Sequence, residues 1–308
     1  TCALPIYPAL LMSGGITVRF FGVRGSTPCD DPALARYGGN TSCVVLDAPG
    51  HDPIVLDLGT GLRTYGAEVS AADADAAWHG HVLLSHLHWD HVQGLPFFTP
   101  LHRPDASIEI FGPVHPEGPL GAVFERFMGP PFFPIRPSDL PARIAFHDVE
   151  PGRFSVGDAA VTAIRVRHTG PTLGFRVDLE GVSVAYVPDH GPGCSHEHPD
   201  DFVPDDVLGL CDGVDLLIHD AQHTVAEYPA KRHWGHSTID YAVEVARRAG
   251  VRRLALFHHD PTHCDASIDR NEAHARSLVA AGGVEVLAAR EGLRLELAPS
   301  RTAGGVRT

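Results

Sequence analysis

Short apolar runs, separated by polar stretches that carry glycine and proline, repeat along most of the chain. Runs of this kind between turn residues are typical of buried strands. They fall into two groups along the sequence. We expect a first group of strands at 16–21, 43–46, 54–58, 82–84 and 108–111, and a second group at 161–166, 173–177, 182–187, 216–218 and 254–257.

Residues 238–249 show the periodicity of a helix most clearly. Apolar residues there recur at i, i+3, i+4 and i+7 from Ile239 to Ala246, which gives the segment one apolar face. Ser237 is placed to cap the start of this helix and Gly250 to close its end. Helices between strands predict an α/β domain in which helices cover the sheets.

Length and composition fit one such domain. A chain of 308 residues, 44% of them hydrophobic, can bury one large core, and we expect a single domain over 13–298. Residues 1–12 end at the first methionine, contain two prolines and lack a basic leader, so we expect a non-native or disordered leader there, not a signal peptide or a membrane span. Residues 299–308, rich in glycine, threonine and arginine, predict a flexible tail.

Charge and cysteine content narrow the partners and the compartment. The net charge is −14 and Lys231 is the only lysine, so the sequence has no basic stripe of the kind that follows a nucleic-acid backbone. This argues against a large nucleic-acid substrate and favours a small molecule. The six cysteines show no close pairing in so long a chain, which favours reduced thiols and a cytoplasmic protein without membrane association.

Four side chains that commonly bind metal lie close together, directly after the expected strand at 82–84: His86, His88, Asp90 and His91. We expect them to occupy the loop that leaves this strand, where their nitrogen and oxygen atoms can converge on a divalent ion. A solvated histidine-rich loop is the alternative, since the chain has 21 histidines. The interleaved aspartate favours the metal site, and these donors suit zinc first, with manganese or iron as alternatives.

The pattern His-x-His-x-Asp-His after an apolar strand resembles the signature of the metallo-β-lactamase superfamily. Further segments follow in that family's order: VLDLGTG with Asp57, RVRHTG with His168, AYVPDHG with Asp189 and LALFHHDP with His258. The resemblance covers most of the chain. It implies a four-layer αββα sandwich with the site at the edge between two sheets, and a hydrolase that carries two divalent metal ions.

The resemblance also implies how the ligands divide between the two ions. The implied assignment is His86, His88 and His168 on one ion, Asp90, His91 and His258 on the other, and Asp189 bridging both. Of the neighbours His258 and His259, we prefer His258 because it directly follows the strand at 254–257. Asp57 is better suited to orient a ligand histidine than to bind metal itself.

A second group of residues bears on the type of chemistry. His219 and Asp220 end one expected strand, and residues 235–238, Gly-His-Ser-Thr, immediately precede the expected helix. A helix N-terminus attracts phosphate, and an imidazole there can protonate a leaving alkoxide. His236 would be that acid and Asp220 its orienting carboxylate. The alternative is that His236 is merely the residue before a helix.

These segments resemble the phosphodiesterase branch of the superfamily, which contains tRNA 3′-end processing endoribonucleases, cyclic-nucleotide phosphodiesterases and phosphoribosyl cyclic phosphodiesterases. The opening segments FFGVRGSTP and RYGGNTSCVV resemble the small-substrate members. That likeness implies that Arg24, Ser26, Asn40 and Thr41 lie on loops near the site, and ordinary turn formation is their alternative role. The tRNA-clamping arm of the processing enzymes has no clear counterpart in this chain.

The resulting hypothesis is a phosphodiesterase that acts on a small cyclic phosphodiester or a cyclic nucleotide. A metal-bridging hydroxide attacks phosphorus, Asp90 or Asp189 steers its proton, and His236 with Asp220 assists the leaving alkoxide. The alternatives are a lactone or thioester hydrolase, a tRNA 3′-processing-type endoribonuclease and a metal-dependent sensing module. The proline-rich segments 112–119 and 129–141 are expected to form loops or a lid near the substrate, or a contact within a homodimer.

Overall fold

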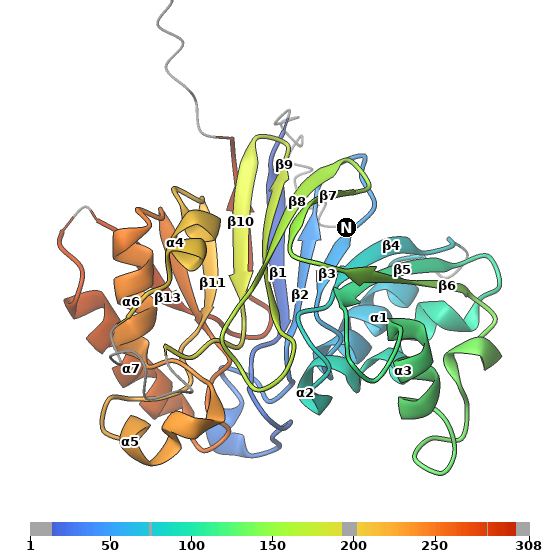
Figure 1. Cartoon of the computed structure of the whole chain (residues 1–308), viewed down its shortest axis with the longest axis horizontal. Coiled ribbons are helices and arrows are strands. Elements are labelled where there is room, and N and C mark those ends of the chain that lie inside the picture. Colours follow the sequence, from blue (N-terminus) through green and yellow to red (C-terminus); the bar gives the residue numbers. More distant parts are fainter. Residues whose placement is uncertain (1–13, 74–75, 193–201, 282, 300–308) are drawn as a thin grey trace, which may run out of the picture.

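The computed structural model describes residues 14–73, 76–192, 202–281 and 283–299 (Figure 1). The expected leader at 1–12 and all but Pro299 of the expected tail lie outside the described residues. The described chain forms two seven-stranded sheets that face each other.

The first sheet is built from the N-terminal half of the chain and the last strand. Its order is β14 (Arg294–Leu297), β1 (Ile16–Gly22), β2 (Cys43–Asp47), β3 (Ile54–Leu56), β4 (His79–Leu83), β5 (Ser107–Pro113) and β6 (Arg143–Val149). Strands β3 to β6 run parallel, and β14, β1, β2 and β3 pair antiparallel. The register of β1 with β14 places Ile16 opposite Leu297, which joins the two ends of the described chain.

The second sheet contains the remaining strands. Its order is β13 (Glu285–Ala288), β12 (Arg253–Phe257), β11 (Leu216–Asp220), β10 (Val182–Val187), β9 (Leu173–Leu179), β8 (Ala159–Arg165) and β7 (Gly152–Val156). Strands β10 to β13 run parallel and β7 to β10 antiparallel. All six residues of β10 are buried, as expected for a continuous apolar run in the centre of a sheet.

Helices cover the outer face of each sheet, so that the layers are helix, sheet, sheet, helix (Figure 1). The first sheet carries α1 (Gly61–Ala72), α2 (Trp89–Val92) and α3 (Leu120–Phe127), and the second carries α4 (Asp205–Cys211), α6 (Ile239–Arg248) and α7 (Asp265–Ser277). The short helix α5 (Tyr228–Lys231) lies in the connection between β11 and α6. One apolar core lies between the sheets and includes Phe20, Phe175 and Phe257, and a further core lies under each helical layer. The expected four-layer αββα sandwich is confirmed.

Three local expectations were incomplete or wrong. Strands β6, β7, β13 and β14 were not expected at all, and residues 89–92 form a turn of helix where we expected only a loop. The cap of α6 is Thr238, whose side chain accepts a hydrogen bond from the Tyr241 amide at 3.1 Å. The Ser237 hydroxyl does not cap the helix, because it donates to the His190 carbonyl instead. Gly250, at φ 64°, does follow the helix end.

The ends of the central strands supply one edge of the sandwich with side chains. Asp57 follows β3, His86 to His91 follow β4, Asp189 follows β10, and His258 follows β12. Since β3 and β4 are parallel neighbours in one sheet and β10, β11 and β12 in the other, their carboxyl ends meet at this edge. Among the helices of the described residues, none has the length and apolar character that crossing a bilayer requires.

Candidate metal centre

The structure brings all seven expected metal ligands together in two groups. The first group is His86, His88, His168 and Asp189, and the second is Asp90, His91 and His258. Within each group the nearest ligand atoms all lie within 4.8 Å of one another. The roles of these residues as ligands stay a prediction, but their positions are those that the prediction requires.

The first group converges from three loops, two of which supply histidine nitrogens and the third the Asp189 carboxylate. His88 Nδ1 lies 2.8 Å from His86 Nε2 and 3.1 Å from His168 Nε2. Asp189 Oδ2 lies 3.6 Å from His86 Nε2 and 3.4 Å from His168 Nε2. Four donor atoms therefore face one common point.

The second group is equally close and fully buried except for a small part of Asp90. Asp90 Oδ2 lies 3.2 Å from His91 Nε2 and 3.0 Å from His258 Nε2, and the two ring nitrogens are 3.3 Å apart. Asp189 Oδ1 lies 3.1 Å from His91 Nε2 and 3.2 Å from His258 Nε2. Asp189 thus directs one carboxylate oxygen at each group.

These spacings fit divalent cations. Four donors placed tetrahedrally at about 2 Å from a zinc ion are separated by about 3.3 Å, close to the distances within both groups. Hydrogen bonds alone satisfy the Asp189 carboxylate poorly. Its Oδ1 is buried and lies 3.1 Å from His91 Nε2, but it has no partner with hydrogen-bond geometry in the described chain. An imidazole and carboxylate donor set without a thiolate suits zinc, manganese or iron.

Protonation in the two groups also favours cation binding. Burial lowers the pKa of His88 to about 4 and that of His86 well below its usual value, so both rings are neutral near pH 7. Burial raises the pKa of Asp189, but the histidines around it outweigh this effect and hold it well below the usual value. For His91, burial lowers the pKa and the carboxylates of Asp90, Asp189 and Asp57 together raise it above its usual value, so a bound cation would displace a proton there.

The outer ring nitrogens of three ligand histidines are held by neighbours. His91 Nδ1 lies 2.7 Å from Asp57 Oδ2, and His168 Nδ1 lies 2.8 Å from the Gly235 carbonyl. His86 Nδ1 lies 3.0 Å from the Ser85 hydroxyl. Such partners fix the tautomer and the direction of a ligand imidazole. Asp57 has the orienting position that we expected, with φ 60°, a strained value for a residue other than glycine.

The neighbouring histidines His258 and His259 point to different places. His258 lies in the second group, at φ 58°. His259 Nε2 lies 2.8 Å from the Ala289 carbonyl, and burial lowers the pKa of His259 to about 3. The structure therefore brings His258 and not His259 to the other ligands.

His236 adjoins both groups, and together with Asp189 and His258 it forms a third set of side chains close enough to hold a metal ion. Its Nδ1 lies 2.8 Å from Asp220 Oδ2, and its ring stacks on His258 with centroids 4.9 Å apart. Asp220 also accepts hydrogen bonds from the His190 and Gln222 amides, at 3.1 Å and 3.0 Å. Burial lowers the pKa of His236, but the adjacent Asp220 outweighs it and raises the pKa above its usual value. The expected His236–Asp220 pair is thus formed beside the metal centre.

The order of strands, the paired sheets and the clustered ligands all point to one superfamily. The family model described as "Beta-lactamase superfamily domain" matches residues 44–259 of the 308. The chain belongs to the metallo-β-lactamase superfamily. It is a metal-dependent hydrolase of this fold, and the fold implies binding of divalent metal ions.

Similar proteins support the assignment of this chain to the metallo-β-lactamase superfamily. An uncharacterized protein of Mycobacterium tuberculosis (strain ATCC 25618 / H37Rv) is 30% identical over 256 residues, which cover 80% of this chain and 81% of that protein. Ribonuclease Z of Streptococcus suis (strain 98HAH33) is 26% identical over 311 residues, covering 85% and 94%. The crystal structure of the metallo-β-lactamase fold protein YhfI from Bacillus subtilis has a TM-score of 0.67 at 19% identity, covering 92% of this chain and 99% of that chain.

We expected four N-terminal residues near the site: Arg24, Ser26, Asn40 and Thr41. Of these, Ser26 contacts a candidate ligand. Its amide donates to Asp90 Oδ2 at 2.8 Å, and its hydroxyl accepts from Gln222 at 3.2 Å. Asn40 is bound to Glu291, and Thr41 and Thr60 exchange hydrogen bonds. Arg24 is fully buried and donates to backbone carbonyls. We found no substrate-facing role for Arg24, Asn40 or Thr41.

The second proline-rich segment, 129–141, contacts the 3₁₀ turn Leu95–Phe97 that follows α2, and α2 itself contacts α3. The Phe133 ring is 5.8 Å from that of Phe97, and the Trp89 ring is 5.2 Å from that of Phe127. Trp89 and Phe132 are 62% and 76% exposed. The exposed Trp89 therefore lies on the helix that carries Asp90 and His91.

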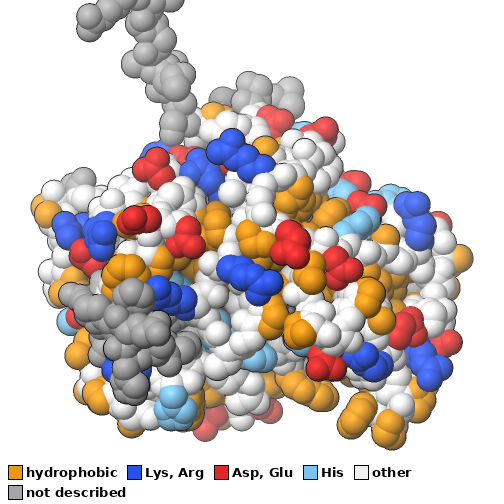
Figure 2. All heavy atoms as spheres, viewed as in Figure 1, with side chains coloured by type: hydrophobic (Ala, Val, Ile, Leu, Met, Phe, Trp, Pro, Cys, Tyr) orange, Lys and Arg blue, Asp and Glu red, His pale blue; other side chains and the backbone are white. Residues whose placement is uncertain are grey.

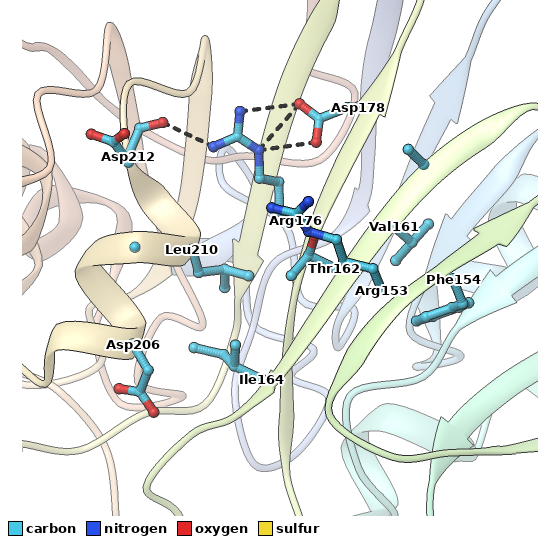
Figure 3. Close-up of a pocket in the computed structure, with 12 residues that line it drawn as sticks. Arg153, Phe154, Val161, Thr162, Ile164, Arg176, Asp178, Asp206, Leu210 and Asp212 are labelled. Atoms are coloured by element: carbon cyan, nitrogen blue, oxygen red, sulfur yellow. Dashed lines mark hydrogen bonds and ion pairs between the residues drawn. The ribbon is translucent and has the colours of Figure 1, made fainter.

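A separate groove of about 570 Å³ lies on the outer face of the second sheet, between α4 and strands β7 to β9 (Figure 3). Phe154, Ile164 and Leu210 form its apolar part, and Arg176 is held by Asp178 and the Asp212 carbonyl. None of the metal-centre residues lines this groove. It has no part in the chemistry considered below.

Proposed function

We propose that this chain is a dinuclear metal-dependent phosphodiesterase that hydrolyses a small cyclic phosphodiester or cyclic nucleotide. The observation that carries the proposal is the His236–Asp220 pair, 2.8 Å apart and in ring contact with His258. An acid held at this position can protonate the alkoxide that leaves a phosphodiester. A lactone also releases an alkoxide, and the likeness to ribonuclease Z favours the phosphodiester between the two.

The proposed roles follow from the atoms that each residue offers. Two ions would be held by His86, His88 and His168 and by Asp90, His91 and His258, and Asp189 directs one carboxylate oxygen toward each of these groups. When bound, two divalent ions supply an activated water near neutral pH and positive charge for the phosphoryl oxygens. Asp90 or Asp189 accepts the proton of the attacking water.

His236 supplies the proton for the leaving group. Asp220 fixes its Nδ1, which leaves Nε2 to face the substrate. The raised pKa of His236 keeps the ring protonated further toward neutral pH than a free imidazole. Protonation of the departing alkoxide by Nε2 completes the hydrolysis.

Surface charge supports a small substrate. The net charge is −14 with a single lysine, and on the face shown in Figure 2 basic side chains are interspersed with acidic ones. Binding of a long nucleic acid relies on a continuous basic surface.

The likeness to ribonuclease Z favours a second candidate, a tRNA 3′-processing-type endoribonuclease. The two candidates share the metal centre and the acid, so they differ in substrate size and not in chemistry.

A substrate panel separates these functions. Zinc- or manganese-loaded protein is assayed against cyclic nucleotides, a ribose cyclic phosphate, a tRNA precursor and a lactone. We expect hydrolysis of a cyclic phosphodiester and none of the lactone. Cleavage of the tRNA precursor alone would select the second candidate, and lactone hydrolysis alone would contradict both.

A further inference from the structure

Residues 24–26, which follow β1, touch two of the three side chains of the second ligand group. Gly25 packs against the ring of His258 so closely that a Cβ atom on Gly25 would lie 2.4 Å from Nδ1 and 2.5 Å from Cε1. Gly25 is not among the residues with positive φ. Close approach, and not backbone conformation, therefore requires glycine at this position.

This contact replaces a hydrogen bond that three of the other ligand histidines have. The outer ring nitrogens of His86, His91 and His168 each face a polar partner, whereas His258 Nδ1 is buried and has none within the described chain. The ring of His258 is thus oriented by packing against Gly25 and His236.

The next residue fixes the carboxylate of the same group. The Ser26 amide donates to Asp90 Oδ2 at 2.8 Å, the oxygen that also lies 3.0 Å from His258 Nε2. Ser26 has φ 63°, a left-handed value that is strained for serine. Strain of this kind persists where the surrounding structure needs the backbone group in one place.

Arg24 anchors these residues to the loop after His258. Its side chain donates to the carbonyls of Gly38, Asp260 and His263 at 2.8, 3.1 and 2.7 Å. Backbone hydrogen bonds from the Gly25 amide to the His259 carbonyl and from the His259 amide to the Val23 carbonyl, both 3.0 Å, run alongside. Arg24 is fully buried and its Nη2 has no hydrogen-bond partner in the described chain, which is a costly arrangement for a guanidinium.

From these contacts we infer that residues 24–26 are positioning residues for the second metal ion. Arg24 holds the loop that carries His258, Gly25 sets the direction of its ring, and the Ser26 amide sets the Asp90 carboxylate. The first ion depends on His86, His88 and His168, which residues 24–26 do not touch in any described contact. The inference rests on the proposed two-metal centre.

The test counts ions in Gly25→Ala against a matched glycine control. Metal-free proteins are loaded with zinc, freed of excess metal and analysed for zinc per chain, with melting temperatures recorded before loading. The control is Gly209→Ala, because a Cβ on Gly209 meets no atom within 4 Å. We expect two ions in the wild type and in Gly209→Ala, and one ion in Gly25→Ala at a nearly unchanged metal-free melting temperature.

Arg24→Lys provides a second, more conservative variant. Lysine keeps the charge but cannot reach three carbonyls with a rigid fork, so we expect the affinity for the second ion to fall by about 10-fold or more while the first stays unchanged. Two ions bound with wild-type affinity in both variants would overturn the inference. Loss of both ions together, or failure of both variants to fold, would assign residues 24–26 to general stability and overturn it too. A wild-type protein that binds fewer than two ions would instead overturn the proposed two-metal centre on which the inference rests.

Discussion

Two groupings of histidine with carboxylates lie at opposite ends of β10. They differ in burial and in whether the histidine nitrogens are available to bind a metal ion. At one end, Asp189 faces the ligand histidines. At the other, His51 lies between Asp158 and Glu180, with its Nδ1 and Nε2 at 3.0 and 2.9 Å from their oxygens. The first grouping is buried and the second is largely exposed.

Composition alone does not distinguish the metal centre from the His51 grouping, since both combine histidine with carboxylates. Both ring nitrogens of His51 are engaged in hydrogen bonds to acids, so neither lone pair is free for a cation, and these hydrogen bonds raise the pKa of His51. Each ligand histidine instead keeps one nitrogen at the common point. Convergence of buried donor atoms, and not a high histidine content, therefore marks the metal centre.

The largest expected effect comes from the carboxylate that both ligand groups share. Asp189→Asn removes the charge and places an amide N–H₂ toward imidazole nitrogens, so we expect loss of metal and a fall in turnover of about 10³-fold or more. Asp158→Asn, at the His51 grouping, is the control and should keep both the bound metal and the wild-type turnover. Metal analysis and rate measurements check this, and two firmly bound ions in Asp189→Asn with turnover within tenfold of wild type would refute the shared role.

His236→Ala should lower kcat by about 100-fold or more, the usual scale for loss of a general acid. Both ions should remain bound, because each of the two proposed ligand groups keeps all its members without His236, although His236 also lies close to Asp189 and His258. Steady-state kinetics together with metal analysis make the distinction. Full activity in this variant would remove His236 from the mechanism.

Tyr186→Phe tests the support behind His91. The Tyr186 hydroxyl donates to Asp57 Oδ2 at 2.8 Å, and that oxygen lies 2.7 Å from His91 Nδ1. We expect the affinity for the second ion to fall by about 10-fold, the lower range for partners that orient a ligand. Tyr65→Phe, which removes a buried hydroxyl paired with Trp78, is the control. Equal affinities in the two variants would show that Tyr186 contributes packing only.

The smallest effect is expected at the exposed grouping. Because the pKa of His51 is raised in the folded protein, its ion pairs stabilise the fold below the unfolded pKa of about 6.5, and this stabilisation is lost as pH rises through the folded pKa. His51→Gln should lower the melting temperature by about 2 °C or less at about pH 5.5 and by nothing measurable at about pH 8.5. A larger loss of melting temperature at the higher pH would contradict the expected pH dependence. Any loss of bound metal would contradict the distinction between the His51 grouping and the metal centre.

Ten of the strands could be predicted because they are interior strands with continuous apolar runs. The four that were missed, β6, β7, β13 and β14, are the edge strands of the two sheets. An edge strand is more exposed than an interior strand, so its apolar pattern is weak, as in β6 and β7, each of which has a single buried residue. The joining of β14 to β1 rests on a pairing across nearly the whole chain, which local patterns do not report.

The candidate ligands were found because each follows a strand that the pattern reveals. What holds them could not be found in the same way. The Tyr186–Asp57 hydrogen bond joins residues 129 positions apart, and the contact of Gly25 with His258 depends on the absence of a side chain. The FFGVRGSTP segment did signal proximity to the site, but its arginine is a buried anchor and not a group facing the substrate.

The central claim is that two ions and His236 together cleave a phosphodiester. The most direct measurement is hydrolysis of a cyclic nucleotide and a ribose cyclic phosphate while zinc is titrated into the metal-free protein. We expect turnover of at least one of them to reach its maximum at two equivalents per chain. A maximal rate at one equivalent, or no hydrolysis of either compound at any ratio, would contradict the account.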